Sequence, residues 1–145
     1  MGLNADTAGI NLWGQVVGSS QPLGGDGDEE HYLAVLYSRG KVTNLGALVD
    51  VSDAMAINDL GVIAGQSYVL YGLDQTATVY MNGITYNLNL ITTNLSQFTS
   101  GVPTGVAAIA YLTVATAIND AGQILVSAGE NGGPFASFLL SPVKK

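Results

Sequence analysis

One ten-residue pattern occurs three times in this chain and constrains the fold more than any other feature of the sequence. It starts at Ile10, Ile57 and Ile118, and every copy has Asn at its second position and Gly at its fifth. A second apolar segment follows each copy. A repeat of about 45 residues is the size of one propeller blade. We therefore expect three similar units rather than one irregular domain.

The pattern itself predicts a tight turn between two short strands. An Asn side chain at the first position of a type I turn can bond the backbone two residues on, and a Gly three positions later readily takes a positive φ. Such a turn, closed by a glycine bulge, is a common hairpin connection. Backbone geometry thus explains the recurrence of these residues better than catalysis does. The expected structural turn residues are Asn11, Gly14, Asn58, Gly61, Asn119 and Gly122.

The segments that follow the turns predict further hairpins. Strand-like runs flank Arg39-Gly40 and Asn82-Gly83, and the last of these runs is expected to extend from residue 84 to residue 90. Asn-Gly between two such runs is a strong hairpin signal. Each unit then offers about four strands. The expected fold class is all-β, a propeller-like array of about three four-stranded antiparallel repeats.

The whole chain, residues 1–145, is expected to be one repeat domain. Repeat 1 covers about residues 5–50, repeat 2 about 51–91 and repeat 3 about 108–143, with an insertion over about 92–107. The third unit stops after its third strand. Propellers typically close with about 4–8 four-stranded blades, so three units would leave apolar faces and strand edges open to another chain. We therefore expect a homo-oligomer that closes the ring, with a dimer favoured.

The repeats also resemble a known family. The motif Ile-Asn-x-x-Gly-Gln-Val-Val-Gly-Ser, an apolar strand and a step such as Asn44-Leu45-Gly46 are similar to the probable extracellular HAF-repeat proteins of bacteria. The likeness covers nearly the whole chain and implies a secreted or cell-surface protein of unassigned function. Two positions depart from the pattern. Val126 stands where the other copies have Gly, and Leu12 stands where they have Asp.

Composition and charge exclude several kinds of function. The chain has no cysteine, which rules out disulfides, cysteine-ligated metals and thiol catalysis. Its four basic and eleven acidic residues argue against nucleic acid as a partner, because phosphate binding needs clustered Lys and Arg. The most apolar window, residues 105–118, is shorter than the ~20 residues of a membrane span, so no membrane span is expected.

An acidic loop is the best candidate for a metal site. Asp26, Asp28 and Glu30 alternate as the first ligands of a calcium loop do, and carboxylate oxygens suit Ca²⁺. The sixth position, however, is His31 instead of Gly, and the twelfth is Tyr37 instead of Glu. The alternative is a solvated surface loop between two hairpins.

Three aromatic residues are candidates for binding or for an interface. His31 is the only imidazole, and its titration near neutrality would suit a base or a ligand. Tyr32 is one of several strand tyrosines that could stack on a sugar or a peptide. Trp13 lies at a turn, where an indole is either exposed for a partner or buried between chains. Asp50 and Asp53 could pair as acid and base, or they could simply be turn residues.

Two functions follow from these observations. The first is a non-catalytic, extracellular β-repeat module that binds a small molecule, glycan or protein, or has a structural role. The alternative is a small Ca²⁺-dependent hydrolase that acts on an ester, a lactone or a glycan through the acidic loop. A fold alone does not decide between them, because function depends on a site.

Overall fold

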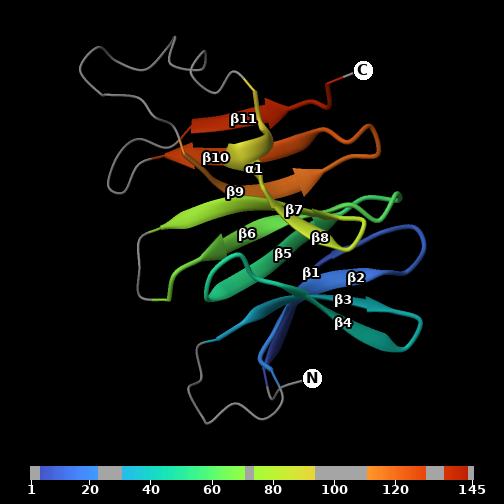
Figure 1. The fold of residues 1–145 in the computed structure, drawn as a ribbon. Coiled ribbons are helices and arrows are strands. Elements are labelled where there is room, and N and C mark those ends of the chain that lie inside the picture. The colour runs from blue at the N-terminus through green and yellow to red at the C-terminus, as the bar shows by residue number, and fades with distance from the viewer. Residues whose placement is uncertain (1–3, 23–30, 71–73, 94–110, 130–135, 144–145) are drawn as a thin grey trace, which may run out of the picture.

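The computed structural model describes residues 4–22, 31–70, 74–93, 111–129 and 136–143. Within these ranges the chain forms eleven strands and one short helix (Figure 1). The strands lie in three antiparallel sheets, numbered here in chain order. The all-β prediction is therefore confirmed, and the described strands do not close into a ring.

Each sheet is a meander, in which strands that are consecutive in the chain pair with each other. Sheet 1 contains β1 (Ala5–Ile10), β2 (Val16–Ser20), β3 (Leu33–Ser38) and β4 (Lys41–Gly46). Sheet 2 contains β5 (Val51–Ile57), β6 (Ile63–Tyr68), β7 (Gln75–Met81) and β8 (Ile84–Asn87). Sheet 3 contains β9 (Tyr111–Ile118), β10 (Ile124–Gly129) and β11 (Ala136–Leu140).

The two-residue hairpins form where the sequence predicts them. Arg39 and Asn82 both have a positive φ, +50° and +54°, and each is followed by a glycine at about +80°. Two consecutive positive φ values define the type I′ turn, whose twist matches that of the strands it joins. Arg39 is the unusual residue here, because a long side chain rarely takes this backbone conformation.

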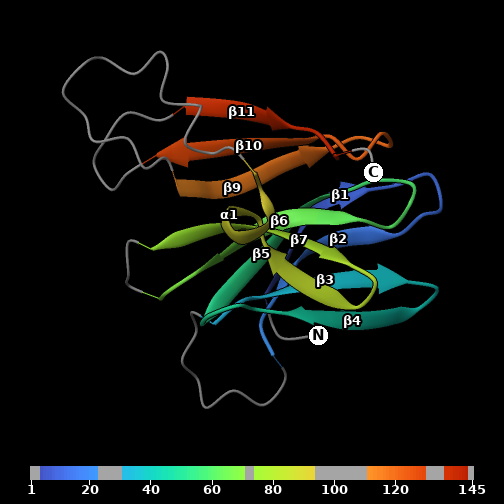
Figure 2. The same ribbon diagram turned by 45° about the horizontal axis from the view of Figure 1, so that its top comes forward.

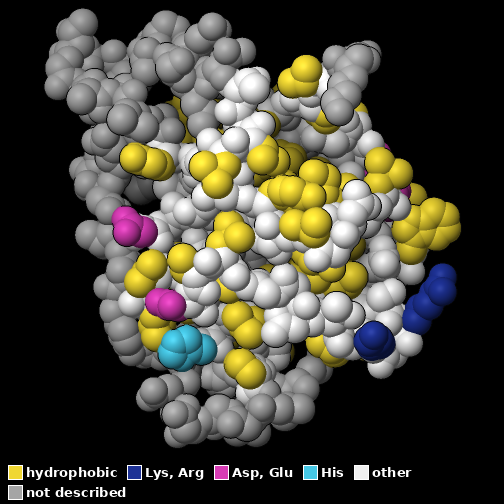
Figure 3. Space-filling model, viewed as in Figure 1, with side chains coloured by type: hydrophobic (Ala, Val, Ile, Leu, Met, Phe, Trp, Pro, Cys, Tyr) yellow, Lys and Arg dark blue, Asp and Glu magenta, His cyan; other side chains and the backbone are white. Residues whose placement is uncertain are grey.

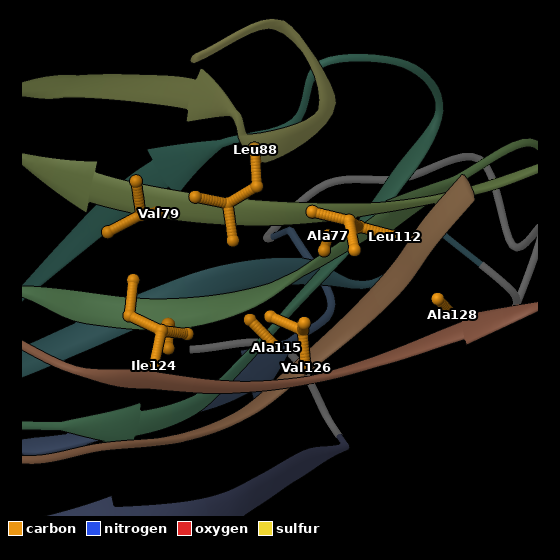
Figure 4. Close-up of a cluster of buried hydrophobic side chains, with 9 residues drawn as sticks. Ala77, Val79, Leu88, Leu112, Ala115, Ile124, Val126 and Ala128 are labelled. Carbon is orange, nitrogen blue, oxygen red and sulfur yellow. The ribbon is translucent and has the colours of Figure 1, made fainter. Parts of the chain in front are cut away.

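The three sheets pack face to face in chain order (Figures 1 and 2). β5 of sheet 2 contacts β2 and β3 of sheet 1, and β9 of sheet 3 contacts β6 and β7 of sheet 2 in the same manner. One core lies between sheets 1 and 2 and includes Val17, Ile57 and Ile63. A larger core lies between sheets 2 and 3, where Val79, Leu112 and Val126 meet (Figure 4).

The end of repeat 2 differs from the prediction. A strand to residue 90 was expected, but β8 ends at Asn87. The Asn87 side chain accepts a hydrogen bond from the Asn89 backbone N–H and caps the single helical turn α1 (Leu88–Ile91). This is ordinary N-cap chemistry, which competes with strand extension. The turn places Leu88 in the core between sheets 2 and 3.

Val126, which replaces the glycine of the other two repeats, lies where the strand pairing of sheet 3 also differs. At the equivalent Gly18 and Gly65, an added Cβ would overlap the carbonyl oxygen of Asp6 or Asp53 on the neighbouring strand. Val126 is fully buried at this position. The register of β9 against β10 shifts twice, whereas β1 and β5 each shift once against their partners. The backbone opposite Val126 therefore follows a different course.

Charged side chains are sparse on the face shown in Figure 3. Hydrophobic side chains extend across its centre, Lys and Arg lie at its right edge, and the His side chain lies toward its left together with acidic side chains, which are aspartates among the described residues. The only described helix, α1, has four residues, and nothing among the described helices has the length and apolarity of a membrane span.

Candidate functional site

The three Asn-x-x-Gly turns share one local geometry. In each turn the Asn carbonyl accepts a hydrogen bond from the Gly backbone N–H at 3.0–3.1 Å, as Asn58 does from Gly61. The Asn58 Oδ1 also accepts from the backbone N–H groups of Leu60 and Val62, at 3.1 and 2.9 Å. The glycines have φ values of +71° to +78°. A residue with a side chain would be strained in this conformation.

The same turns bond to one another across the sheets. The Asn11 Nδ2 donates to the carbonyl oxygen of Asn58 at 3.1 Å, and the Asn58 Nδ2 donates to the carbonyl oxygen of Asn119 at 3.1 Å. A second series runs beside the first one. The Leu12 backbone N–H donates to Asp59 Oδ1, and the Asp59 backbone N–H donates to Asp120 Oδ1, both at 2.9 Å. We call this set of inter-sheet bonds the turn ladder.

The turn ladder has a direction. Every bond runs from a donor in one sheet to an acceptor in the next sheet of the chain. Asn119 belongs to the last sheet, and its Nδ2 donates to Gln123 Oε1 of its own turn at 2.8 Å. Asn11 makes the same bond within its turn, to Gln15 Oε1, in addition to its ladder bond. One amide group can therefore serve both its own turn and the next sheet.

Trp13 lies on the ladder as a largely exposed side chain. Its indole Nε1 donates to the carbonyl oxygen of Asp59 at 2.8 Å, so the ring extends toward the turn of sheet 2. Leu12 and Leu60, on the same turns, are exposed too. Trp13 is 74% exposed in a single chain, as both alternatives, exposure for a partner and burial between chains, require.

A small polar cluster lies where β5 and β6 pair. The Gln66 Nε2 donates to Asp53 Oδ2 at 2.9 Å, and the Gln66 Oε1 is buried with no hydrogen-bond partner among the described residues. Burial raises the pKa of the Tyr68 hydroxyl, and the charge of Asp53 together with a hydrogen bond to it raises that pKa further. A neutral phenol is therefore held beside a carboxylate. Asp50, the other member of the predicted acid–base pair, accepts from the Leu70 backbone N–H at 3.4 Å.

An apolar cavity of about 450 Å³ opens between sheets 2 and 3. Val79, Leu88 and Ile91 line one side, and Ile124 and Leu140 line the other. The polar part of the lining comes from Thr92, Thr93 and Ser141. Figure 4 shows Val79 and Leu88 across from Ile124. Ligand pockets commonly have volumes of about 300–1,000 Å³ and mostly apolar walls. The size and the lining suit a small apolar molecule.

The predicted metal ligands Asp26, Asp28 and Glu30 lie outside the described residues. His31 is described and exposed, and Tyr32 is half-buried, with its carbonyl accepting from the Ser52 backbone N–H at 3.0 Å. Over the described ranges, no group of three His, Cys, Asp or Glu side chains is arranged to hold a metal ion. The calcium site therefore stays a prediction from the sequence.

The turn chemistry of the asparagines predicts their bonds within each turn but not their bonds to the neighbouring sheets. A signal for the ladder was present in the sequence. Asp59 and Asp120 follow the Asn in two of the three copies, which a type I turn alone does not require.

Comparisons with known proteins do not assign this chain to a family. No protein-family model, no curated protein and no solved structure matches it. The likeness to HAF repeats therefore depends on the sequence motif alone, and function has to be argued from the geometry described above.

Proposed function

We propose that the chain is a non-catalytic β-repeat module with a structural or binding role, in which the three sheets act as consecutive blades of a propeller-like assembly. The turn ladder is the observation that carries this proposal. It joins sheet to sheet at equivalent positions, through hydrogen bonds of 2.9–3.1 Å. Repeated inter-unit bonds of this kind are what a stacked array requires.

The use of the polar side chains supports the non-catalytic role. Catalytic carboxylates are usually free to exchange protons or to bind a substrate. Asp59 and Asp120 instead accept ladder bonds from backbone N–H groups, and Asp53 is bonded to Gln66. The polar groups that recur in the repeats thus hold the sheets together.

We further propose that a second copy completes the ring. Two copies provide six sheets, within the range of about 4–8 blades at which propellers close, whereas three copies would provide nine. Secretion or display on the cell surface, which the likeness to HAF repeats implies, is part of this proposal. The hydrolase alternative depends on the acidic loop over residues 26–31, of which the structure describes only His31, an exposed side chain.

The solution mass tests the proposal. Light scattering coupled to gel filtration, at micromolar to hundred-micromolar concentrations, should give twice the 14.9 kDa mass of one chain. A mass of one chain at every concentration would contradict ring closure by a second copy. A hydrolase screen with and without Ca²⁺ should detect no turnover.

The apolar cavity favours a binding role in particular. We propose that it holds a small apolar ligand. Titration with an anilinonaphthalene dye should give saturable fluorescence, and Ile91→Lys should abolish this signal because Ile91 lines the cavity. Ile84→Lys, an exposed position of sheet 2 outside the cavity lining, is the matched control. Equal dye binding by both variants would remove the cavity from the proposal.

A further inference from the structure

Sheets 1 and 3 each have one face on which no described sheet packs. The sheet 1 open face includes Thr7, Ile10, Val16 and Tyr37, and the sheet 3 open face includes Ala117, Leu125 and Leu139. Residue pairing and the cores assign these faces, because the neighbouring strand positions point into the interior. None of these seven residues is charged.

The sheet 3 open face occupies positions that are buried in the other two repeats. Strand pairing makes Val17, Ala64 and Leu125 equivalent, and their exposed fractions are 1%, 0% and 43%. Val79 and Leu139 are equivalent as well, with 3% and 58% exposed. The next sheet in the chain covers these positions in sheets 1 and 2. In sheet 3, two leucines are exposed at the same positions.

The sheet 1 open face closely resembles a face that is already docked in this structure. Ile10 of sheet 1 is equivalent to Ile57 of sheet 2, and Tyr37 is equivalent to Tyr80. Ile57 is 8% exposed, because it packs against sheet 1 together with Tyr80, whereas Ile10 is 69% exposed. The same pair of side chains, Ile and Tyr, thus packs against sheet 1 when it belongs to sheet 2 and has no sheet against it when it belongs to sheet 1.

We propose that the sheet 3 open face of one copy docks on the sheet 1 open face of a second copy, in the geometry of the interfaces inside the chain. This inference rests on the proposed function, since it specifies the surface through which the ring closes. The occupant is a second copy, because its sheet 1 carries Ile10 and Tyr37. These residues are equivalent to Ile57 and Tyr80, which sheet 2 packs against sheet 1 inside the chain. Two such contacts related by a twofold axis close a ring of six sheets.

The turn ladder would continue across this junction in part. The Asn119 Nδ2 bonds only within its own turn among the described residues, so it has a second hydrogen to donate to the Asn11 carbonyl oxygen of the other copy. Inside the chain, the backbone N–H groups of Leu12 and Asp59 each donate to an Asp side chain of the next sheet. At the junction, the Asp120 backbone N–H would meet Leu12 of the second copy at that position. Leu12 has no acceptor. The junction therefore lacks one of its two ladder bonds and should be weaker than the internal interfaces.

The first test places a charge on the proposed interface. Leu139→Glu should convert the dimer to a monomer in sedimentation equilibrium at 50 μM, because a carboxylate would be buried against an apolar face. Ile84→Glu is the matched control, since Ile84 is 53% exposed but lies on neither open face. It should leave the mass unchanged.

The second test supplies the missing ladder bond. Leu12→Asn adds an acceptor without adding charge, and it should lower the dimer dissociation constant about fivefold or more, because both junctions gain a hydrogen bond. Leu12→Ala, which removes the same side chain without providing an acceptor, should give no such tightening.

The outcomes separate this inference from the proposed function. A dimer that Leu139→Glu leaves intact, or that Leu12→Asn does not tighten, overturns the interface while ring closure by a second copy still stands. A wild-type monomer at all concentrations overturns both. A monomeric Leu139→Glu together with a tighter Leu12→Asn dimer supports both.

Discussion

Replacing Asn58 by Ala should destabilise the fold far more than the same change at Asn119, although both residues start the same turn. The Asn58 side chain makes three hydrogen bonds: its Oδ1 accepts two within the turn, and its Nδ2 donates one to the carbonyl oxygen of Asn119. It is also buried, with 4% of its surface exposed. Truncation leaves these partners unsatisfied in a place that water reaches poorly.

The magnitude follows from the number and the burial of these bonds. One hydrogen bond contributes about 0.5–1.5 kcal/mol net, so Asn58→Ala should cost about 1.5–4.5 kcal/mol of unfolding free energy. Asn119 is exposed, and its side chain bonds only to Gln123 of the same turn. Because water can replace these bonds, Asn119→Ala should cost about 1 kcal/mol or less. Asn11→Ala should lie between the two, since Asn11 is half-buried and has one ladder bond.

Urea unfolding followed by circular dichroism measures these differences. The variants should be compared in the Leu139→Glu background, so that sheet 3 has the same open face in every sample. Asn58→Asp is a further test, because it keeps the Oδ1 acceptor but replaces the ladder donor with a carboxylate oxygen that faces the Asn119 carbonyl oxygen, so it should cost more than the loss of the donor alone. Equal destabilisation at Asn58 and Asn119, within about 0.5 kcal/mol, would show that the ladder contributes little beyond the turns themselves.

Three further predictions concern packing, titration and metal binding. Gly65→Ala should lower the free energy of unfolding by at least about 1–3 kcal/mol, because the new Cβ would overlap the carbonyl oxygen of Asp53. Val126→Ala, at the equivalent position, should lower it by about 1.6 kcal/mol for two buried methyl groups, plus a cavity term. Urea unfolding distinguishes both changes from neutral ones. The pKa of Tyr68, followed by absorbance at 295 nm, should lie above the ordinary tyrosine value of 10.0, and Asp53→Asn should lower it. Since this pKa is raised in the folded state, the stability linked to it is present below pH 10 and declines as the pH rises from there, a decline that Tyr68→Phe should remove. Neither EDTA nor Ca²⁺ should move the melting temperature if residues 26–30 are a solvated loop, whereas a rise with Ca²⁺ would support a calcium site there.

The turns and hairpins could be predicted from the sequence because their causes are local. Asn82-Gly83 needs two positive φ values in succession, and these two residues tolerate them better than most others. The Asn-x-x-Gly turns depend in the same way on residues that are four positions apart or closer. The end of β8 was missed because Asn87 has two local options, and the pattern of apolar residues favoured the strand.

The ladder could not be predicted from the turn chemistry, because its bonds join residues 47 and 61 positions apart. Their formation depends on how the sheets stack, and nothing within one repeat determines that. The effect of Val126 was only partly predictable. The sequence showed that a side chain replaces a glycine, but the second register shift of β9 emerges only from the pairing of two strands.

The direction of the ladder has a consequence for assembly. Donors face one end of the stack and acceptors face the other, so the two open faces of this chain are unlike each other. Two unlike faces cannot pair with themselves across a twofold axis, but each can pair with the opposite face of another copy. Such head-to-tail contacts either close into a ring or extend into a filament. With three sheets per chain, two copies would give a ring of ordinary blade number, which is why we propose a discrete dimer rather than an open-ended polymer.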